Sequence, residues 1–189
     1  MSPRTAIGAL WILWVASWAV GSLWTAPTAK AAGRSERPFR LLMIAGALLF
    51  VLGSAAQRTA DFQLWNLGTP ALWALVAVQA AAFTFTWWAR LHLGRLWSSD
   101  VVLKEAHRVV DTGPYAIVRH PIYTGVIVAL IVTALWIGTL FAIAGLCLMV
   151  RAFWLKARLE ERFLSAEMGQ GAYEAYARRV PMLVPFGLR

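Results

Sequence analysis

The sequence predicts an all-α integral membrane protein with about five transmembrane helices, the last two forming a tight helical hairpin, followed by a cytosolic C-terminal helical segment. Of the 189 residues, 60% are hydrophobic and only 14% are charged. A soluble domain averages about 45–50% apolar and about 25% charged residues. A globule of this size in water could not bury so much apolar surface. No internal repeat is visible, so residues 1–189 are predicted to form a single membrane domain.

Three apolar segments in the N-terminal half each predict a membrane helix. The first runs from about residue 5 to residue 24 and carries three tryptophans on one helical face. The second covers about residues 39–57. Its Gly46 and Gly53 are seven residues apart, which predicts a close-packed seam with another helix. The third covers about residues 70–88.

A further apolar run, residues 121–150, holds thirty residues without a charged side chain. As one helix it would be about 45 Å long, whereas the hydrocarbon core of a bilayer is about 30 Å thick. A glycine within residues 136–139 favours a turn, so two short helices in a hairpin are expected. Beyond residue 150 an amphipathic helix is predicted to leave the bilayer, and a short second helix begins at Tyr173. Cys147, inside the apolar run, is predicted to pack in the core.

Basic residues gather in the segments between the apolar runs and give a net charge of +9. This distribution is typical of loops that face anionic lipid on the cytosolic side, so no nucleic-acid partner is expected. With five spans, the basic segments 30–40 and 90–119 and the C-terminal region lie on one side. The positive-inside rule then predicts a cytoplasmic (inner) membrane protein with its N-terminus outside and its C-terminus in the cytosol.

Polar residues that carry chemistry gather beside the last apolar run. Residues 107–115 and 119–125 contain two histidines, two tyrosines and two arginines, and Glu160 and Glu161 follow at the end of the run. Such side chains are costly to keep next to a bilayer without a use. Three histidines without a second cluster of acidic residues and histidine indicate no metal site.

The spacing of these residues resembles a known family. The pattern consists of Leu93-Gly94-x-x-Trp97, His107-x-x-Val110-x-x-Gly113-x-Tyr115, Arg119-His120-Pro121-x-Tyr123-x-Gly125, Glu160-Glu161-x-x-Leu164, Gly169, Tyr173-x-x-Tyr176, Arg179-Val180-Pro181 and Pro185. It resembles the isoprenylcysteine carboxyl methyltransferase family, to which membrane enzymes that methylate phospholipid amines are related. The resemblance covers roughly residues 90–186. It implies a cofactor-binding half, residues 90–189, after the three N-terminal spans of residues 1–89.

The resemblance implies that S-adenosyl-L-methionine is the cofactor. The residues that match its binding positions are His107, Arg108, Val109, Val110, Tyr115, His120, Pro121, Ile122, Tyr123 and Glu160. Gly113 belongs to the same motif. The chemistry of the cofactor adds Arg119 as a candidate. The amine of S-adenosylmethionine needs an acceptor, its carboxylate and ribose need cations or donors, and its sulfonium favours aromatic rings.

Lys156, Glu160 and Arg158 are the candidate catalytic residues. Lys156 stands where the resemblance places a substrate-contacting arginine, and a lysine lacks the planar two-point grip of arginine on a carboxylate. Arg158 is close enough in the sequence to take its place. Lys156 and Glu160 are four residues apart, so one helical face presents both, one towards the acceptor and the other towards the donor.

Each of these residues also has a simpler interpretation. Arg119, Lys156 and Arg158 are common choices for interfacial anchors on lipid phosphates. Tyr115 and Tyr123 taken alone are typical of an aromatic belt. Glu160 and Glu161 could pair with Arg158 or Arg162, and His92 has no motif partner and is expected to be structural.

The predicted function is methyl transfer from S-adenosylmethionine to a lipophilic acceptor that enters between helices. A prenylcysteine-like carboxylate is the first expectation, a phospholipid amine the alternative, and a thiol the third. The expected partners are the lipophilic substrate and membrane lipids, with no protein partner inferred. A transporter or structural subunit is the non-enzyme alternative. It would place polar side chains along the middle of the spans, where Gln79 is the main exception.

Overall fold

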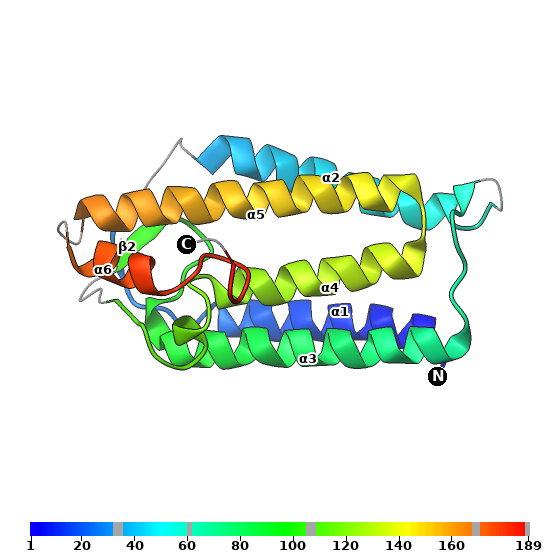
Figure 1. The fold of residues 1–189 in the computed structure, drawn as a ribbon, viewed down its shortest axis with the longest axis horizontal. Coiled ribbons are helices and arrows are strands. Elements are labelled where there is room, and N and C mark those ends of the chain that lie inside the picture. The colour runs from blue at the N-terminus through cyan, green and yellow to red at the C-terminus, as the bar shows by residue number, and fades with distance from the viewer. Residues whose placement is uncertain (32–35, 60–61, 105–108, 168–170, 188–189) are drawn as a thin grey trace.

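A computed structural model of the chain describes residues 1–31, 36–59, 62–104, 109–167 and 171–187. Its long helices lie side by side along one axis (Figure 1). In chain order the elements are α1 (Pro3–Gly21), β1 (Thr28–Ala31), α2 (Arg37–Ala56), α3 (Thr69–Leu93), η3 (Gly94–Leu96), β2 (Val102–Lys104), η4 (Gly113–Ala116), α4 (Pro121–Ile137), α5 (Leu140–Glu167) and α6 (Ala172–Arg179). Within the described residues, α1, α2, α3 and α5 are long and apolar enough to cross a membrane, and α4 is shorter. The chain is therefore an all-α membrane protein apart from one small sheet.

The helices pack mainly in two groups. α5 lies along α2, and α4 lies along α3, which also carries α1. The seam predicted at Gly46 and Gly53 is confirmed, because both glycines are buried against α5. A Cβ atom on Gly46 would lie 2.8 Å from the Met149 side chain and 3.0 Å from the carbonyl oxygen of Gly145. Small residues on both helices thus bring the two backbones together.

Replacing Gly145 by alanine should separate α2 from α5. The new Cβ would lie 2.9 Å from the backbone oxygen of Gly46, which cannot rotate away. We expect a loss of about 1–3 kcal/mol, measured as a lower thermal unfolding midpoint in detergent. Gly8→Ala on α1 is the matched control, since nothing lies within 4 Å of its added Cβ. An equal loss in both variants would contradict the proposed seam.

The tryptophans of α1 face the rest of the bundle. The Nε1 group of Trp11 donates to Oγ1 of Thr133 on α4 at 2.9 Å. Trp14 donates likewise to Thr86 on α3 at 2.8 Å, and its ring stacks on that of Trp18 at a centroid distance of 4.8 Å. These indoles dock α1 onto two helices, so the shared face predicted from their spacing serves packing.

α3 continues to Leu93, five residues beyond its predicted end at Trp88. The predicted span ended just before Arg90, yet Arg90 is only 1% exposed. Its guanidinium donates to the carbonyl oxygens of Gly94 at 2.6 Å and of Gly21 and Trp24 at 2.7 Å each. Buried charge is tolerated when such partners are present. Arg90 thereby ties the end of α1 to the end of α3.

α4 and α5 are joined by Gly138 and Thr139, within the predicted turn at residues 136–139. Gly138 has a φ of +65°, a conformation that glycine adopts without strain. The two helices pack mainly on α3 and α2 respectively. α5 has 28 residues and is about 42 Å long, because it continues without a break from the apolar run into the amphipathic segment that was expected to leave the bilayer.

Two further expectations are corrected. Cys147 is exposed on the outside of α5 and does not pack in the core. A small antiparallel sheet, which the sequence did not suggest, pairs β1 with β2.

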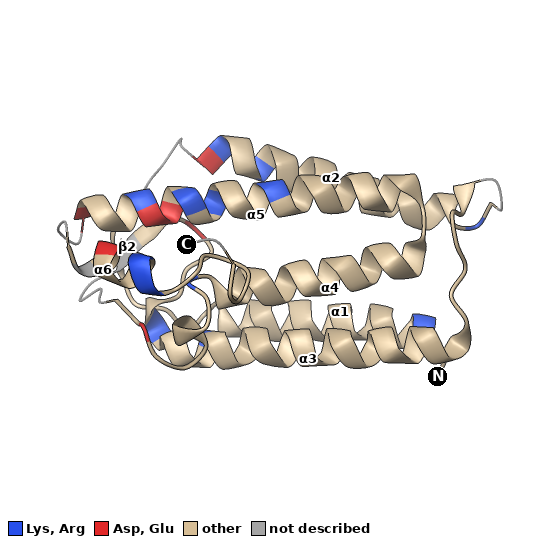
Figure 2. Ribbon diagram, in the orientation of Figure 1, with Lys and Arg blue, Asp and Glu red and all other residues tan. Residues whose placement is uncertain are grey.

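Charged residues gather at the end of the molecule that holds α6 and the sheet, while the middle of the helices is almost free of them (Figure 2). Gln79, the exception in the third span, is fully buried and donates to the carbonyl oxygen of Ile7 at 3.1 Å. It joins α3 to α1. The polar groups thus lie at one end of the bundle, as the enzyme hypothesis expects and the transporter hypothesis does not.

Candidate active site

A cavity of about 140 Å³ lies at the charged end of the bundle. Four parts of the chain surround it: the segment after α3, the start of α4 with η4, the polar half of α5, and α6. The lining residues are Leu93, Leu96, Trp97, Ser98, Asp100, Val101, Val102, Val109, Val110, Tyr115, Arg119, His120, Pro121, Ile122, Tyr123, Glu160, Phe163, Leu164, Tyr173 and Tyr176. Most of its wall is apolar and aromatic, and its charged groups come from the segment after α3, which holds Asp100, from the start of α4 and from α5.

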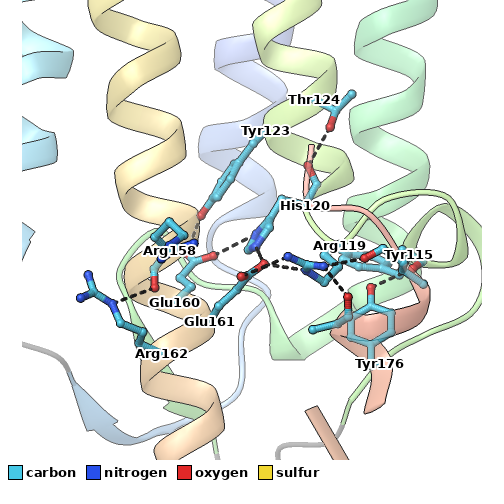
Figure 3. Close-up of polar contacts among 12 residues, drawn as sticks. Tyr115, Arg119, His120, Tyr123, Thr124, Arg158, Glu160, Glu161, Arg162 and Tyr176 are labelled. Atoms are coloured by element: carbon cyan, nitrogen blue, oxygen red, sulfur yellow. Dashed lines mark hydrogen bonds and ion pairs between the residues drawn. The ribbon is translucent and has the colours of Figure 1, made fainter. Parts of the chain in front are cut away.

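His120 stands between two carboxylates of α5 (Figure 3). Its Nε2 atom lies 3.1 Å from Oε1 of Glu161, and its Nδ1 atom lies 3.4 Å from Oε2 of Glu160. The hydroxyl of Tyr123 donates to Glu160. The His120 and Tyr123 rings stack at a centroid distance of 5.2 Å with an interplanar angle of 5°. Glu160 is thereby oriented from two sides and still lines the cavity.

Arg119 joins the cluster to the C-terminal segment. Its guanidinium donates to both carboxylate oxygens of Glu161, at 2.7 and 3.2 Å. It also donates to the carbonyl oxygens of Ala177 at 2.8 Å and Val180 at 2.6 Å. Only the planar five-donor fork of arginine can reach this many acceptors at fixed angles. Glu161 therefore pairs with Arg119 and His120, and not with Arg158 or Arg162 as one interpretation of the sequence had it.

The C-terminal segment lies along the start of α4. The backbone N–H groups of Arg119 and His120 donate to the carbonyl oxygens of Pro181 at 2.9 Å and Met182 at 3.1 Å. The hydroxyl of Thr124 donates to the carbonyl oxygen of Leu183 at 2.6 Å. Because α4 begins only at Pro121, the N–H groups of Arg119 and His120 precede the helix and can bond to the C-terminal segment. The pairing fixes the backbone that carries Arg119 and His120.

The carboxylates set the charge of His120. Burial by itself lowers the pKa of this imidazole, but the hydrogen bonds and charges of Glu160 and Glu161 outweigh burial and hold the pKa above its ordinary value of 6.5. Burial raises the pKa of Tyr115 far above its ordinary value of 10.0, so this hydroxyl stays protonated. The site therefore combines a histidine that favours the charged form with neutral phenols.

Stability of the protein should fall as the pH rises through the titration of His120. A folded-state pKa above 6.5 means that protonation favours the folded state. Its contribution is complete below about pH 6.5 and is lost as the pH rises through the raised pKa. Thermal unfolding in detergent from about pH 6 to about pH 9 should show this loss in the wild type. The loss should be smaller in His120→Gln, and equal slopes in the two proteins would contradict the assignment.

Lys156 lies beside this cluster, buried on the inner face of α5. Its Nζ atom donates to the carbonyl oxygen of Ser99 at 2.7 Å and lies 5.2 Å from the centroid of the Tyr123 ring and 5.7 Å from that of Phe39. No carboxylate of the described residues lies within ion-pair distance of this ammonium. Within the described part of the chain the ammonium makes one hydrogen bond, which leaves two N–H donors for another ligand.

The wall formed by residues 98–101 is held from α2 as well. The carboxylate of Glu36 accepts from the N–H of Val101 at 2.8 Å and from Arg40. Arg40 also donates to Asp100 at 2.8 Å. With the bond from Lys156 to Ser99, this wall is fixed by both helices of the α2–α5 pair.

The structure brings most of the predicted residues together. Those that line the cavity are Val109, Val110, Tyr115, Arg119, His120, Pro121, Ile122, Tyr123 and Glu160, with Lys156 adjacent to them. Gly113 lies behind the wall with a φ of +58°, where a Cβ would be 2.8 Å from His92. His107 and Arg108 lie outside the described residues. Arg158 does not line the cavity, because its guanidinium lies on the exposed side of α5, 5.4 Å from the Trp154 ring centroid.

Several lining residues were not predicted as site residues. Trp97, Phe163 and Leu164 supply apolar wall, and Tyr173 and Tyr176 close it from α6. Tyr176 donates to the carbonyl oxygen of Tyr115 at 2.7 Å. The spacing of three between Tyr173 and Tyr176 was the available signal, because it places both rings on one face of a short helix.

The helices and the cavity define an integral membrane protein whose polar site lies at one end of its spans. Residues 73–166 match the isoprenylcysteine carboxyl methyltransferase (ICMT) family.

Two curated relatives share this region. Protein-S-isoprenylcysteine O-methyltransferase B of Arabidopsis thaliana is 36% identical over 84 residues, which are 44% of this chain and 42% of that protein. Methanethiol S-methyltransferase 2 of Bradyrhizobium diazoefficiens is 45% identical over 73 residues, 38% of this chain and 26% of that protein. The match thus spans less than half the length of either relative. The resemblance seen in the motifs is confirmed.

Proposed function

We propose that the protein is a membrane methyltransferase that transfers a methyl group from S-adenosyl-L-methionine to a lipophilic acceptor. The observation that carries the proposal is the cavity at the end of the membrane helices, in which Glu160, His120 and Tyr123 meet an apolar wall. The match of residues 73–166 to the ICMT family and two relatives named as methyltransferases support the reaction class. The transporter alternative has no such support.

The residues present suit this cofactor by their chemistry. Glu160 offers a carboxylate for an amine or a sulfonium, and Tyr115 and Tyr123 offer electron-rich rings. Apolar side chains such as Phe163 and Leu164 can cover a nucleoside base. When bound, S-adenosylmethionine supplies an activated methyl group for in-line displacement. We infer that the nine predicted residues lining the cavity, together with His107 and Arg108, bind it.

The residues of the chain contribute mainly alignment and exclusion of water. Tyr123 and His120 fix the rotamer of Glu160, while Arg119 fixes Glu161 and, through it, His120. Such second contacts hold a binding group in position before the ligand arrives. His120 can also hold or release a proton at Nδ1, which an acceptor that must lose a proton would require.

The acceptor we infer is anionic. Among the described residues no carboxylate lies within ion-pair distance of the buried ammonium of Lys156, which lies beside the Tyr123 ring. It can therefore hold a negatively charged acceptor while Glu160, four residues further along the same helix, faces the donor. A prenylcysteine-like carboxylate remains the first candidate. The second is a thiolate, because a lysine is a point charge and suits a one-atom anion. A phospholipid amine is disfavoured, since the attacking nitrogen would approach a fixed positive charge.

Calorimetric titration of the detergent-purified protein with S-adenosylhomocysteine tests the cofactor. We expect binding by the wild type and its loss in His120→Ala and Glu160→Ala. Transfer of a labelled methyl group to a prenylcysteine, a small alkyl thiol and phosphatidylethanolamine vesicles then identifies the acceptor. In Lys156→Arg the preference should move towards the carboxylate. A folded wild type that does not bind the cofactor product would overturn the proposed function.

The charged end of the bundle belongs in the cytosol under this proposal. S-adenosylmethionine is a polar cytosolic metabolite, and the basic segments 30–40 and 90–119 agree with the positive-inside rule. The N-terminus then lies outside.

A further inference from the structure

The outer face of α5 carries a continuous stripe of exposed residues that the proposed reaction does not use. Its members are Leu140, Ala144, Cys147, Arg151, Trp154 and Arg158. They follow at steps of three and four residues, so they lie on one side of the helix over about 27 Å. The first three are apolar or weakly polar, and the last three are a tryptophan between two arginines. The stripe thus changes from apolar to cationic along its length. It complements a phospholipid, which changes from an apolar acyl chain to an anionic phosphate.

The two arginines converge on the ring between them. The Cζ atom of Arg151 lies 4.3 Å from the centroid of the Trp154 ring, and that of Arg158 lies 5.4 Å from it. Two like charges on one indole repel each other unless an anion joins them. Among the described residues no carboxylate lies within ion-pair distance of either guanidinium. Glu160 and Glu161, the nearest acids along the helix, are engaged with Tyr123, His120 and Arg119 instead.

The position of Arg151 along α5 places the anion at the level of lipid headgroups. Arg151 lies where the apolar part of the helix passes into its charged part. Arginines near the edge of the hydrocarbon region bring the guanidinium to the interface. Trp154, which is 37% exposed, is a residue type favoured at the same depth.

We propose that Arg151, Trp154 and Arg158 bind the phosphodiester of an anionic phospholipid, with one acyl chain lying along Leu140, Ala144 and Cys147. The guanidinium groups supply donors from both sides of the indole, and the phosphate relieves their mutual repulsion. Beyond Arg158 an open hollow between α5 and α6, lined by Arg162, Ser165 and Glu174 among others, leaves room for the headgroup. Arg158 therefore acts as a lipid ligand on the outside of the protein. This site does not depend on methyl transfer.

Cys147 is the single cysteine of the chain and lies one helical turn from Arg151, so it can carry the probe. A fluorophore on Cys147 in phosphatidylcholine vesicles should be quenched more strongly by spin-labelled phosphatidylglycerol than by spin-labelled phosphatidylcholine at the same content. We expect each arginine to raise the affinity for phosphatidylglycerol relative to phosphatidylcholine about fivefold. This preference for phosphatidylglycerol should fall by that factor in Arg151→Gln and in Arg158→Gln. Arg151→Lys and Arg158→Lys should each keep part of it.

Arg178→Gln removes the same charge from the exposed surface of α6 and is the matched control. It should keep the wild-type preference. Equal quenching by the two lipids in the wild type, or an equal fall in Arg178→Gln, would overturn the site. Suppression of the preference by inorganic phosphate would also overturn it, in favour of a soluble anion. None of these readings involves the methyl donor, so a failure here is distinct from a failure of the proposed function.

Discussion

Glu160→Gln should reduce the affinity for S-adenosylhomocysteine about 100-fold while leaving the protein folded. Glutamine keeps the shape of the side chain and can still accept the hydrogen bond of Tyr123, but it removes the negative charge from the cavity. Hydrogen bonds to charged groups contribute about 1.5–3 kcal/mol, which is up to about two orders of magnitude in affinity. Calorimetric titration gives the affinity, and thermal unfolding shows that the variant is folded.

Glu167→Gln is the matched control on the same helix. Glu167 pairs with Lys30 at 2.6 Å near the surface, away from the cavity. An exposed pair of this kind contributes at most about 1 kcal/mol, so we expect neither affinity nor stability to change much. If both variants bind as the wild type does, Glu160 does not contact the cofactor and the carboxylate serves only to position His120.

The apolar part of the fold was largely predictable from the sequence, because hydrophobic length alone determines which segments can lie in a bilayer. The predicted segments 39–57 and 70–88 became α2 and α3 with shifted ends. At the end of α3, a side chain had found partners far away in the sequence. The guanidinium of Arg90 donates hydrogen bonds to three carbonyl oxygens, and two of them belong to Gly21 at the end of α1 and to Trp24 just after it. Local sequence patterns do not predict such distant hydrogen-bond partners.

The candidate site was predictable to the extent that motifs carry it. His120, Tyr123 and Glu160 do meet, although 37 residues separate Tyr123 from Glu160. The sequence did not predict that Glu160 lines the cavity while Glu161 pairs with Arg119. Adjacent residues on a helix point about 100° apart, and only tertiary packing decides which of them faces the cavity. For the same reason Arg158, two residues from Lys156, lies on the opposite side of α5.

The small sheet of β1 and β2 shows the same limit. Thr28 pairs with Lys104 across 76 residues, and each strand is too short to display the alternation of a half-buried strand. Its position beside the charged end follows from the helices that it connects. Sequence patterns thus predicted the helices and the residue types of the site, and the contacts between distant segments supplied the rest.

Arg119→Gln should cost about 3–5 kcal/mol of stability, as expected when one partner of a buried ion pair is removed. Arg119 is buried and joins α5, α6 and the start of α4 through Glu161, Ala177 and Val180. Its removal leaves Glu161 with only His120 as a partner among the described residues and takes the donor from two carbonyl oxygens in a largely buried site. The thermal unfolding midpoint in detergent should fall by about 10 °C.

Two further variants distinguish geometry from charge. Arg119→Lys keeps the charge but cannot reach acceptors on three segments from one nitrogen, so its loss should lie between those of the wild type and Arg119→Gln. Arg179→Gln breaks an exposed pair with Asp111, whose side chains are 66% and 43% exposed, and should cost at most about 1 kcal/mol. Equal losses in Arg119→Gln and Arg179→Gln would mean that Arg119 does not hold the C-terminal segment against the site. A full rescue by lysine would mean that charge alone suffices, and the four-acceptor geometry would then have no energetic role.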